Sequence, residues 1–145
     1  MTFHFSFEKV LTVKENEKNV LETEYRDAYN EFEKIANMLY GFMKQKETLE
    51  TRQRDHMTKG TSAFHIQRLQ TDIQRLQEKI DRCEGLYQSA RQNIEQKKAR
   101  LTDKSIDVKR FERLKEVHYD MFRKKEKAEE MSQIDEISTI RRVES

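Results

Sequence analysis

Apolar residues recur every three or four positions along most of the chain, and the positions in its two halves mirror each other. The residue numbers of matching apolar positions add to 122 in the pairs Leu21 with Leu101, Ala28 with Ile94, Ile35 with Tyr87, Phe42 with Ile80, and Leu49 with Ile73. Positions between these layers follow the same relation in the pairs Tyr25 with Lys97, Phe32 with Ala90, and Leu39 with Cys83. A heptad pattern that reverses about one point predicts an antiparallel two-helix coiled coil within one chain.

The point of reversal falls in a short segment, Met57-Thr58-Lys59-Gly60-Thr61-Ser62. Gly60 can adopt the left-handed conformation that ends a helix, and Thr61 or Ser62 can cap the helix that follows. In the alternative, Gly60 lies inside one continuous helix at a cost of about 1 kcal/mol, and two chains pair in parallel. We favour the hairpin because a parallel dimer does not require the two halves to mirror each other.

The expected fold class is therefore all-α, a long helical hairpin in one coiled-coil domain over residues 1–145. The first helix is expected at about 5–57, the turn at 58–62 and the second helix at about 63–140. Composition agrees, because 39% of the residues are charged, 34% are hydrophobic and proline is absent. Lys97 and Lys104 occupy positions in the seam, the row along which the two helices meet, where the alkyl stem can pack while the ammonium reaches water.

Several classes of protein are disfavoured by what the sequence lacks. No apolar run approaches the length needed to span a bilayer. The start, in which Phe3, Phe5 and Phe7 alternate with polar residues, does not have the pattern of a secretory signal. The single cysteine, Cys83, lies in the seam, which excludes an intramolecular disulfide and fits a reducing compartment.

No combination of residues predicts catalysis, a cofactor or a metal centre. The four histidines are scattered, and none has metal-ligand spacing with another histidine or the cysteine. His56 and His65 could approach each other near the turn, but two imidazoles without further ligands are typical of ordinary surface residues. A two-helix coiled coil also has no pocket in which to desolvate a reacting group. The sequence therefore predicts a protein that is not an enzyme.

Charge is distributed unevenly, although the net charge is only +2. In residues 97–127 there are 12 Lys and Arg against 6 Asp and Glu, an excess of +6, whereas residues 128–145 carry −3. The simpler interpretation is a solvated helix with intrahelical ion pairs. The alternative is a basic surface for an acidic partner or nucleic acid. Nucleic acid is disfavoured because no base-reading module accompanies the charge.

The mirror relation leaves the end of the second helix without an internal partner. Residues after about Glu116 extend past the start of the first helix, yet they include the apolar residues Val117, Met121, Phe122, Met131, Ile134, Ile137, Ile140 and Val143. Exposed apolar residues at helical spacing predict a docking surface. Alternatively, the N-terminal phenylalanines fold back over Val117 to Phe122, although they hardly reach the segment after Met131.

Three segments resemble FliJ, the small soluble component of the bacterial flagellar type III export apparatus. They are residues 5–15, the glycine hairpin at 57–62, and the end at 127–130 followed by 134–137. The resemblance covers essentially the whole chain and implies a two-helix stalk similar to the γ stalk of rotary ATP synthases. It also implies a location at the cytoplasmic face of the flagellar basal body, with membrane contact only through partners. Those partners are the hexameric export ATPase, the transmembrane export gate and export chaperones.

The same resemblance implies two contact surfaces. The surface for the export gate would consist of Met38, Phe42, Gln45, Leu49, Leu76, Lys79 and Cys83. The surface for the ATPase would lie at the end carrying both termini, on Phe5, Phe7, Leu11, Met131, Ile134, Ile137 and Ile140. Asp72 stands where relatives often carry an aromatic anchor. Phe42, Leu49, Leu76 and Cys83 are also seam positions, for which core packing is the simpler explanation.

Two functions from other classes remain open. A generic dimeric coiled-coil adaptor would sediment as a dimer at low micromolar concentration. A basic helical hairpin that binds RNA or DNA would show salt-dependent affinity for nucleic acid.

Overall fold

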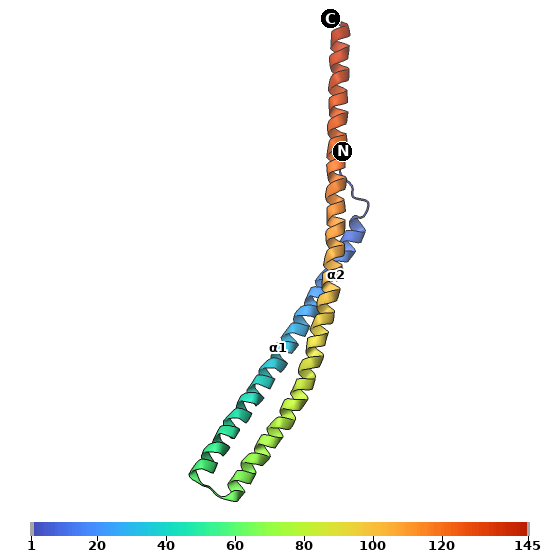
Figure 1. Ribbon diagram of the computed structural model, residues 1–145. Helices are drawn as coiled ribbons and strands as arrows, with labels where there is room; N and C mark the ends of the chain where they lie inside the picture. Colours follow the sequence, from blue (N-terminus) through green and yellow to red (C-terminus); the bar gives the residue numbers. More distant parts are fainter. Residues whose placement is uncertain (1, 145) are drawn as a thin grey trace. The chain divides into compact units, whose positions relative to one another are not determined.

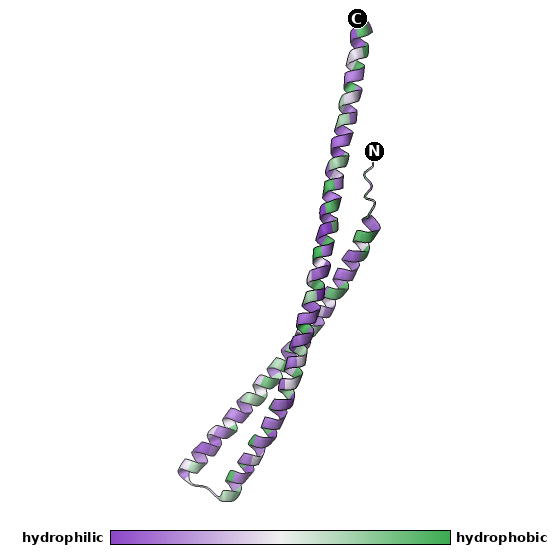
Figure 2. Cartoon of the chain, turned by 45° about the vertical axis from the view of Figure 1, so that its right-hand side comes forward, coloured by the Kyte–Doolittle hydropathy of each residue, from purple (hydrophilic) through white to green (hydrophobic). Residues whose placement is uncertain are grey.

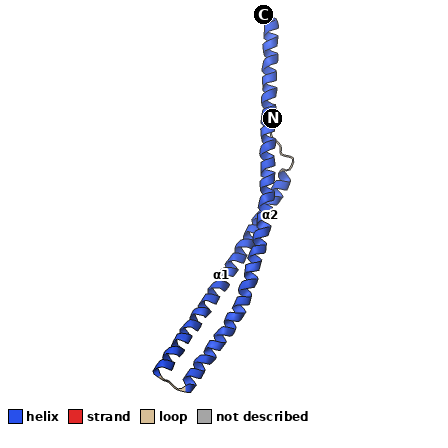
Figure 3. Cartoon of the chain, viewed as in Figure 1, coloured by secondary structure: helices blue, strands red, loops and turns tan. Residues whose placement is uncertain are grey.

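A computed structural model describes residues 2–144, which form two long helices. Helix α1 spans Glu8–Lys59 and α2 spans Ala63–Glu144. Residues 60–62 connect the two helices (Figure 1). No strand occurs in residues 2–144 (Figure 3). The expected all-α class, with two long helices packed against each other, is confirmed.

Contacts within the chain gather into two compact units. The hairpin unit comprises Leu21–Leu101, with the turn and the facing stretches of α1 and α2. The terminal unit comprises the chain up to Val20 together with the chain from Thr102 onward. In each unit α1 and α2 run antiparallel and meet along one seam.

The turn in the hairpin unit has the geometry that its residues predict. Gly60 has a φ of 80° and is the one described residue with a positive φ. Ser62, rather than Thr61, caps α2, because its Oγ accepts a hydrogen bond from the backbone N–H of His65 at 3.2 Å. The glycine therefore ends α1, and the serine starts α2 two residues later.

The seam of the hairpin unit is built from the predicted positions. Its buried residues are each at most 9% exposed: Ala28, Ile35, Leu69, Ile73, Leu76, Ile80 and Cys83. The rings of Phe32 and Tyr87 lie 5.0 Å apart, and the Cys83 thiol donates to the Ile35 carbonyl at 3.7 Å. The residue numbers in these two pairs add to 119 and 118 rather than 122, so the antiparallel pairing is confirmed, while these two contacts fall about one helical turn from the predicted layers.

Polar layers interrupt the apolar seam in the half of the hairpin unit that contains the turn. The Lys46 ammonium donates to the Gln77 side chain at 2.5 Å, and the Gln53 amide donates to the Gln70 side chain at 2.9 Å. Each of these layers replaces apolar burial with a hydrogen bond that contributes about 1 kcal/mol net. Such layers favour one register, because a slip would leave their polar groups without partners.

The terminal unit has a core of its own. Phe5, Leu11 and Val108 are buried, and Phe3, Phe111 and Leu114 pack against them. The first helix begins at Glu8 rather than at about residue 5, because Phe5 enters this core and its carbonyl accepts the Glu8 N–H at 3.1 Å. At its other end α2 continues to Glu144, past the expected limit of about 140.

The N-terminal phenylalanines fold back over part of α2. The Phe3 ring lies 5.2 Å from Tyr119 and 5.5 Å from Phe122, and the Phe5 ring lies 5.5 Å from His118. The alternative in which these rings cover Phe122 is therefore the observed arrangement. The phenylalanine rings do not bury Val117 and Met121, which remain 40% and 63% exposed.

Candidate partner-binding surfaces

Over the residues that the structure describes, the final part of α2 has no buried or half-buried residue. Every described residue from Lys127 to Glu144, a stretch that we call the C-terminal segment, is exposed. Four of the seven residues expected to contact the ATPase lie here: Met131, Ile134, Ile137 and Ile140, with exposed fractions of 59%, 56%, 52% and 55%. Figure 1 shows no other part of the terminal unit beside this stretch, drawn in red. Its apolar side chains are therefore free to meet a partner.

These apolar residues do not form a straight stripe. They recur every third residue from Met131 through Val143, and each step of three turns about 300° around the axis, some 60° short of a full turn. The row therefore winds around the helix, and Met131 and Ile140 point in roughly opposite directions. Figure 2 shows the resulting mixture of apolar and polar positions along the C-terminal segment. A shallow groove could cover only part of this row.

The three remaining residues of the expected ATPase surface lie around the core of the terminal unit. Phe5 and Leu11 are buried, at 6% and 3% exposure. Phe7 is 42% exposed, and its ring packs 5.8 Å from Phe5 and 6.1 Å from Phe111. The structure thus brings these three side chains together, but only Phe7 offers a substantial exposed surface.

The expected gate surface lies in the hairpin unit and combines exposed with buried residues. Met38 is 53% exposed, Gln45 and Lys79 are exposed, and Phe42 and Leu49 are half-buried. The Lys79 ammonium lies 5.9 Å from the centre of the Phe42 ring, which joins α1 and α2 on this surface. Leu76 and Cys83, at 9% and 3% exposure, pack inside the seam instead.

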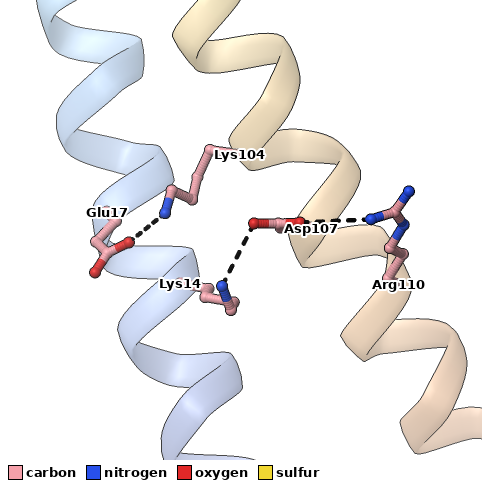
Figure 4. A network of polar contacts seen from close by, with 5 residues as sticks. All are labelled: Lys14, Glu17, Lys104, Asp107 and Arg110. Carbon is pink, nitrogen blue, oxygen red and sulfur yellow. Dashed lines mark hydrogen bonds and ion pairs between the residues drawn. The ribbon is translucent and has the colours of Figure 1, made fainter.

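Ion pairs link the two helices in the terminal unit (Figure 4). The Lys104 ammonium lies 2.5 Å from the Glu17 carboxylate, and the Lys14 ammonium lies 3.4 Å from Asp107. Asp107 also lies 3.9 Å from Arg110, so it stands between two cations. Sequence reasoning expected ion pairs within one helix and missed these crossings. These pairs could have been predicted from the sequence, because the residue numbers of each pair add to within one of the value 122 that relates the two helices.

The pair with the shortest distance shifts the pKa of both partners. The hydrogen bond from Lys104 holds the pKa of the Glu17 carboxyl below its ordinary value, and the same bond raises the pKa of the Lys104 ammonium. Both groups remain open to solvent, so water and salt weaken the attraction. The pair therefore favours the register more than it stabilises the fold.

Ion pairs between the two helices and ion pairs within α2 neutralise part of the positive charge of residues 97–127. Lys97 lies 3.3 Å from Glu24 in the hairpin unit, and Lys115 lies 2.8 Å from Glu8 in the terminal unit. Arg113 pairs with Glu116 within α2 at 3.3 Å. The two seam lysines, Lys97 and Lys104, thus direct their ammonium groups to carboxylates of α1. These pairs reduce the positive charge available to an external anion.

Residues 2–144 contain no group of three or more His, Cys, Asp or Glu side chains placed to hold a metal ion. Neither helix, over the same residues, has a stretch long and apolar enough to cross a membrane.

The sequence and the fold both resemble known proteins. A family profile described as "Flagellar FliJ protein" matches residues 3–144. The flagellar FliJ protein of Bacillus subtilis (strain 168) is 36% identical over 138 residues, which cover 95% of this chain and 94% of that protein. A solved structure from Chlamydia trachomatis, described as a YscO homologue, shares the fold with a TM-score of 0.66 at 16% identity, over 96% of this chain and 94% of that one. The chain therefore belongs to the flagellar FliJ protein family.

Proposed function

We propose that this protein is a non-enzymatic stalk of the flagellar export apparatus and that its C-terminal segment binds the hexameric export ATPase. The observation that carries the proposal is that every residue from Lys127 to Glu144 is exposed, although this stretch carries a row of large apolar side chains. Full burial of one isoleucine contributes roughly 1.5–3 kcal/mol relative to full exposure. Burial of four half-exposed side chains would therefore contribute several kcal/mol to binding.

The winding of the apolar row supports a ring as the partner. Because Met131 and Ile140 point in roughly opposite directions, one flat surface cannot bury both. The opening of a hexameric ring can contact a helix from all sides. A ring partner therefore explains why the apolar positions of this segment do not share one face.

The first experiment removes residues after Ser132. No buried residue is lost, so the melting temperature should stay almost unchanged, while ATPase binding and stimulation should fall steeply. Binding is measured by titration against the purified ATPase, and folding by circular dichroism. If the shortened protein melts much earlier, the segment belongs to the fold. If it binds as well as the full chain, the ATPase contact lies elsewhere.

A second experiment tests whether the partner surrounds the helix. Met131→Ser and Ile140→Ser change opposite sides of the C-terminal segment, and each should weaken ATPase binding about tenfold or more. Ser138→Ala changes an exposed polar residue in the same stretch and should leave binding unchanged. A loss confined to one of the two apolar positions would indicate a one-sided groove and contradict an enclosing ring.

We further propose that the transmembrane export gate contacts the hairpin unit around Met38. Met38, Gln45 and Lys79 are exposed there, and they flank the half-buried Phe42 and Leu49. Leu76 and Cys83 would support this surface from within the seam rather than contact the gate. Met38→Asp should reduce binding to the cytoplasmic part of the gate protein without lowering the melting temperature. Unchanged binding by this variant would remove Met38 from the contact.

Attachment to the basal body through these partners, and escort of export chaperones, belong to the same proposal. The competing functions make different measurable predictions. A dimeric adaptor would sediment at twice the mass of one chain, and a nucleic-acid-binding protein would lose affinity steeply with added salt. We expect neither behaviour, because the seam is filled within one chain and many cations are already paired.

A further inference from the structure

Two histidines face each other across the turn of the hairpin unit. His56 lies in the last turn of α1, and His65 lies near the start of α2. Their ring centres are 4.8 Å apart, and the ring planes meet at 79°. His56 is half-buried and His65 is exposed, so water reaches the pair. The two imidazoles, which the sequence allowed to approach each other, therefore lie in edge-to-face contact where water can reach them.

The turn and the adjacent seam layer hold the two histidines in place. Ser62 accepts hydrogen bonds from the His65 backbone N–H through both its side chain and its carbonyl, at 3.2 Å and 3.1 Å. On the other side, a side-chain hydrogen bond of 2.9 Å between Gln53 and Gln70 links α1 to α2. Little backbone ordering remains to be done when a ligand binds to both rings.

We propose that His56 and His65 form a binding site for a late divalent transition-metal ion. With metal–nitrogen distances of about 2.0–2.1 Å, two imidazoles at neighbouring positions on one ion have ring centres roughly 4.5–5 Å apart. The observed separation of 4.8 Å falls in this range. Small rotations of the side chains would aim both ring nitrogens at a common point, and water would complete the coordination.

The chemistry of the pair selects the kind of ion. Imidazole nitrogen suits Cu²⁺, Ni²⁺ and Zn²⁺, whereas Mg²⁺ requires oxygen ligands. The free carbonyls at the end of α1 carry partial negative charge and favour a cation beside His56. The positive charge of Lys59, in the same turn of α1, disfavours a cation there. Two protein ligands give a weaker site than the three or four of catalytic and structural zinc centres.

Metal binding at this place would tie the end of α1 to the start of α2. An ion that binds both rings in the folded chain, and binds the unfolded chain less well, shifts the equilibrium toward the folded state. We therefore expect Ni²⁺ or Zn²⁺ to raise the melting temperature of the full-length protein. This effect does not require the export ATPase, so it is independent of the proposed function.

The test uses the full chain without a histidine tag. Isothermal titration with NiCl₂ and ZnCl₂ should give one ion per chain, and MgCl₂ should give no heat of binding. His56→Gln and His65→Gln should each weaken the affinity at least tenfold and abolish the rise in melting temperature. His4→Gln changes an exposed histidine of the terminal unit and should leave both quantities unchanged.

Three outcomes would overturn the proposal. The first is the absence of saturable binding of Ni²⁺, Zn²⁺ or Cu²⁺ to the full chain. The second is binding that survives both substitutions at the turn. The third is an increase in sedimentation coefficient with the metal, because that result would mean that the ion bridges two chains rather than two helices of one chain.

Discussion

Burial along the seam varies strongly from one side chain to the next. Ile80 is 3% exposed, whereas Ile94, also a seam isoleucine, is only half-buried. Because the two helices cover each other along one strip, a residue is buried only where the facing side chains are large enough to close over it. The contribution of a seam residue to stability therefore depends on its layer as well as on its type.

Substitution of Ile80 by alanine should destabilise the protein by roughly 2–4 kcal/mol, because it leaves a cavity in the best-covered part of the seam. Ile94→Ala should cost less, since water already reaches part of that side chain. Glu31→Ala, at an exposed position, should change stability by no more than about 0.5 kcal/mol. Urea unfolding measures all three variants. Equal losses at the three positions would contradict the register.

The pair of Glu17 and Lys104 should make stability depend on pH at both ends of the range. Glu17 has a pKa lowered from 4.5, so its contribution is present above pH 4.5 and is lost as the pH falls through the lowered value. Lys104 has a pKa raised from 10.5, so its contribution is present below pH 10.5 and is lost as the pH rises through the raised value.

Glu17→Gln should therefore lower the melting temperature slightly at pH 7 in low salt. At acid pH, where Glu17 is protonated in the parent protein as well, the difference should disappear. Addition of salt should also reduce it, because the groups are exposed. Melting curves at several pH values and salt concentrations provide the measurement. A difference that persists at pH 2 would assign the effect to packing rather than charge.

At the scale of helices, the sequence was sufficient to predict the pairing. Ala28, Ile35, Ile80 and Cys83 are buried where the heptad pattern places them, because the period of apolar residues determines which side of each helix meets the other. The glycine turn was predictable for an equally local reason, since Gly60 can adopt a positive φ at little cost.

Other features depended on contacts that the pattern does not encode. The first helix was expected from about residue 5, yet Phe5 lies in the core of the terminal unit and α1 begins only at Glu8. The resemblance placed Leu76 and Cys83 on the gate surface, but both are buried in the seam, as the heptad pattern itself indicated. The contact residues were carried over from family members, and such a comparison does not show which side chains this chain itself buries.

The C-terminal segment should exchange its amide hydrogens much faster than the seam. Residues 127–144 form a helical stretch in which every residue is exposed, and helices in proteins gain most of their stability from tertiary packing. Leu69 to Cys83 lie in the best-buried part of the hairpin unit and should exchange slowly. Hydrogen–deuterium exchange with mass spectrometry compares the two segments. Equal protection would mean that the C-terminal segment has a partner in the free protein.

For the whole molecule, the main alternative is pairing between two chains. In the hairpin unit the Cys83 thiol contacts the carbonyl of Ile35 on α1, and Leu39 follows Ile35 by one turn on the same side of the helix. Leu39→Cys should therefore form a disulfide with Cys83 within one chain at low protein concentration. Non-reducing electrophoresis separates the outcomes, because a disulfide found only between chains would favour the dimer.

The central claim is that a seam filled within one chain leaves the C-terminal segment of α2 available for the export ATPase. The most direct test places a photoreactive amino acid at Ile137 in one variant and at Met38 in another, both at exposed positions. With the assembled ATPase hexamer, irradiation should crosslink the Ile137 variant to the ATPase in high yield and the Met38 variant only weakly. A strong crosslink from Met38 and none from Ile137 would contradict the account.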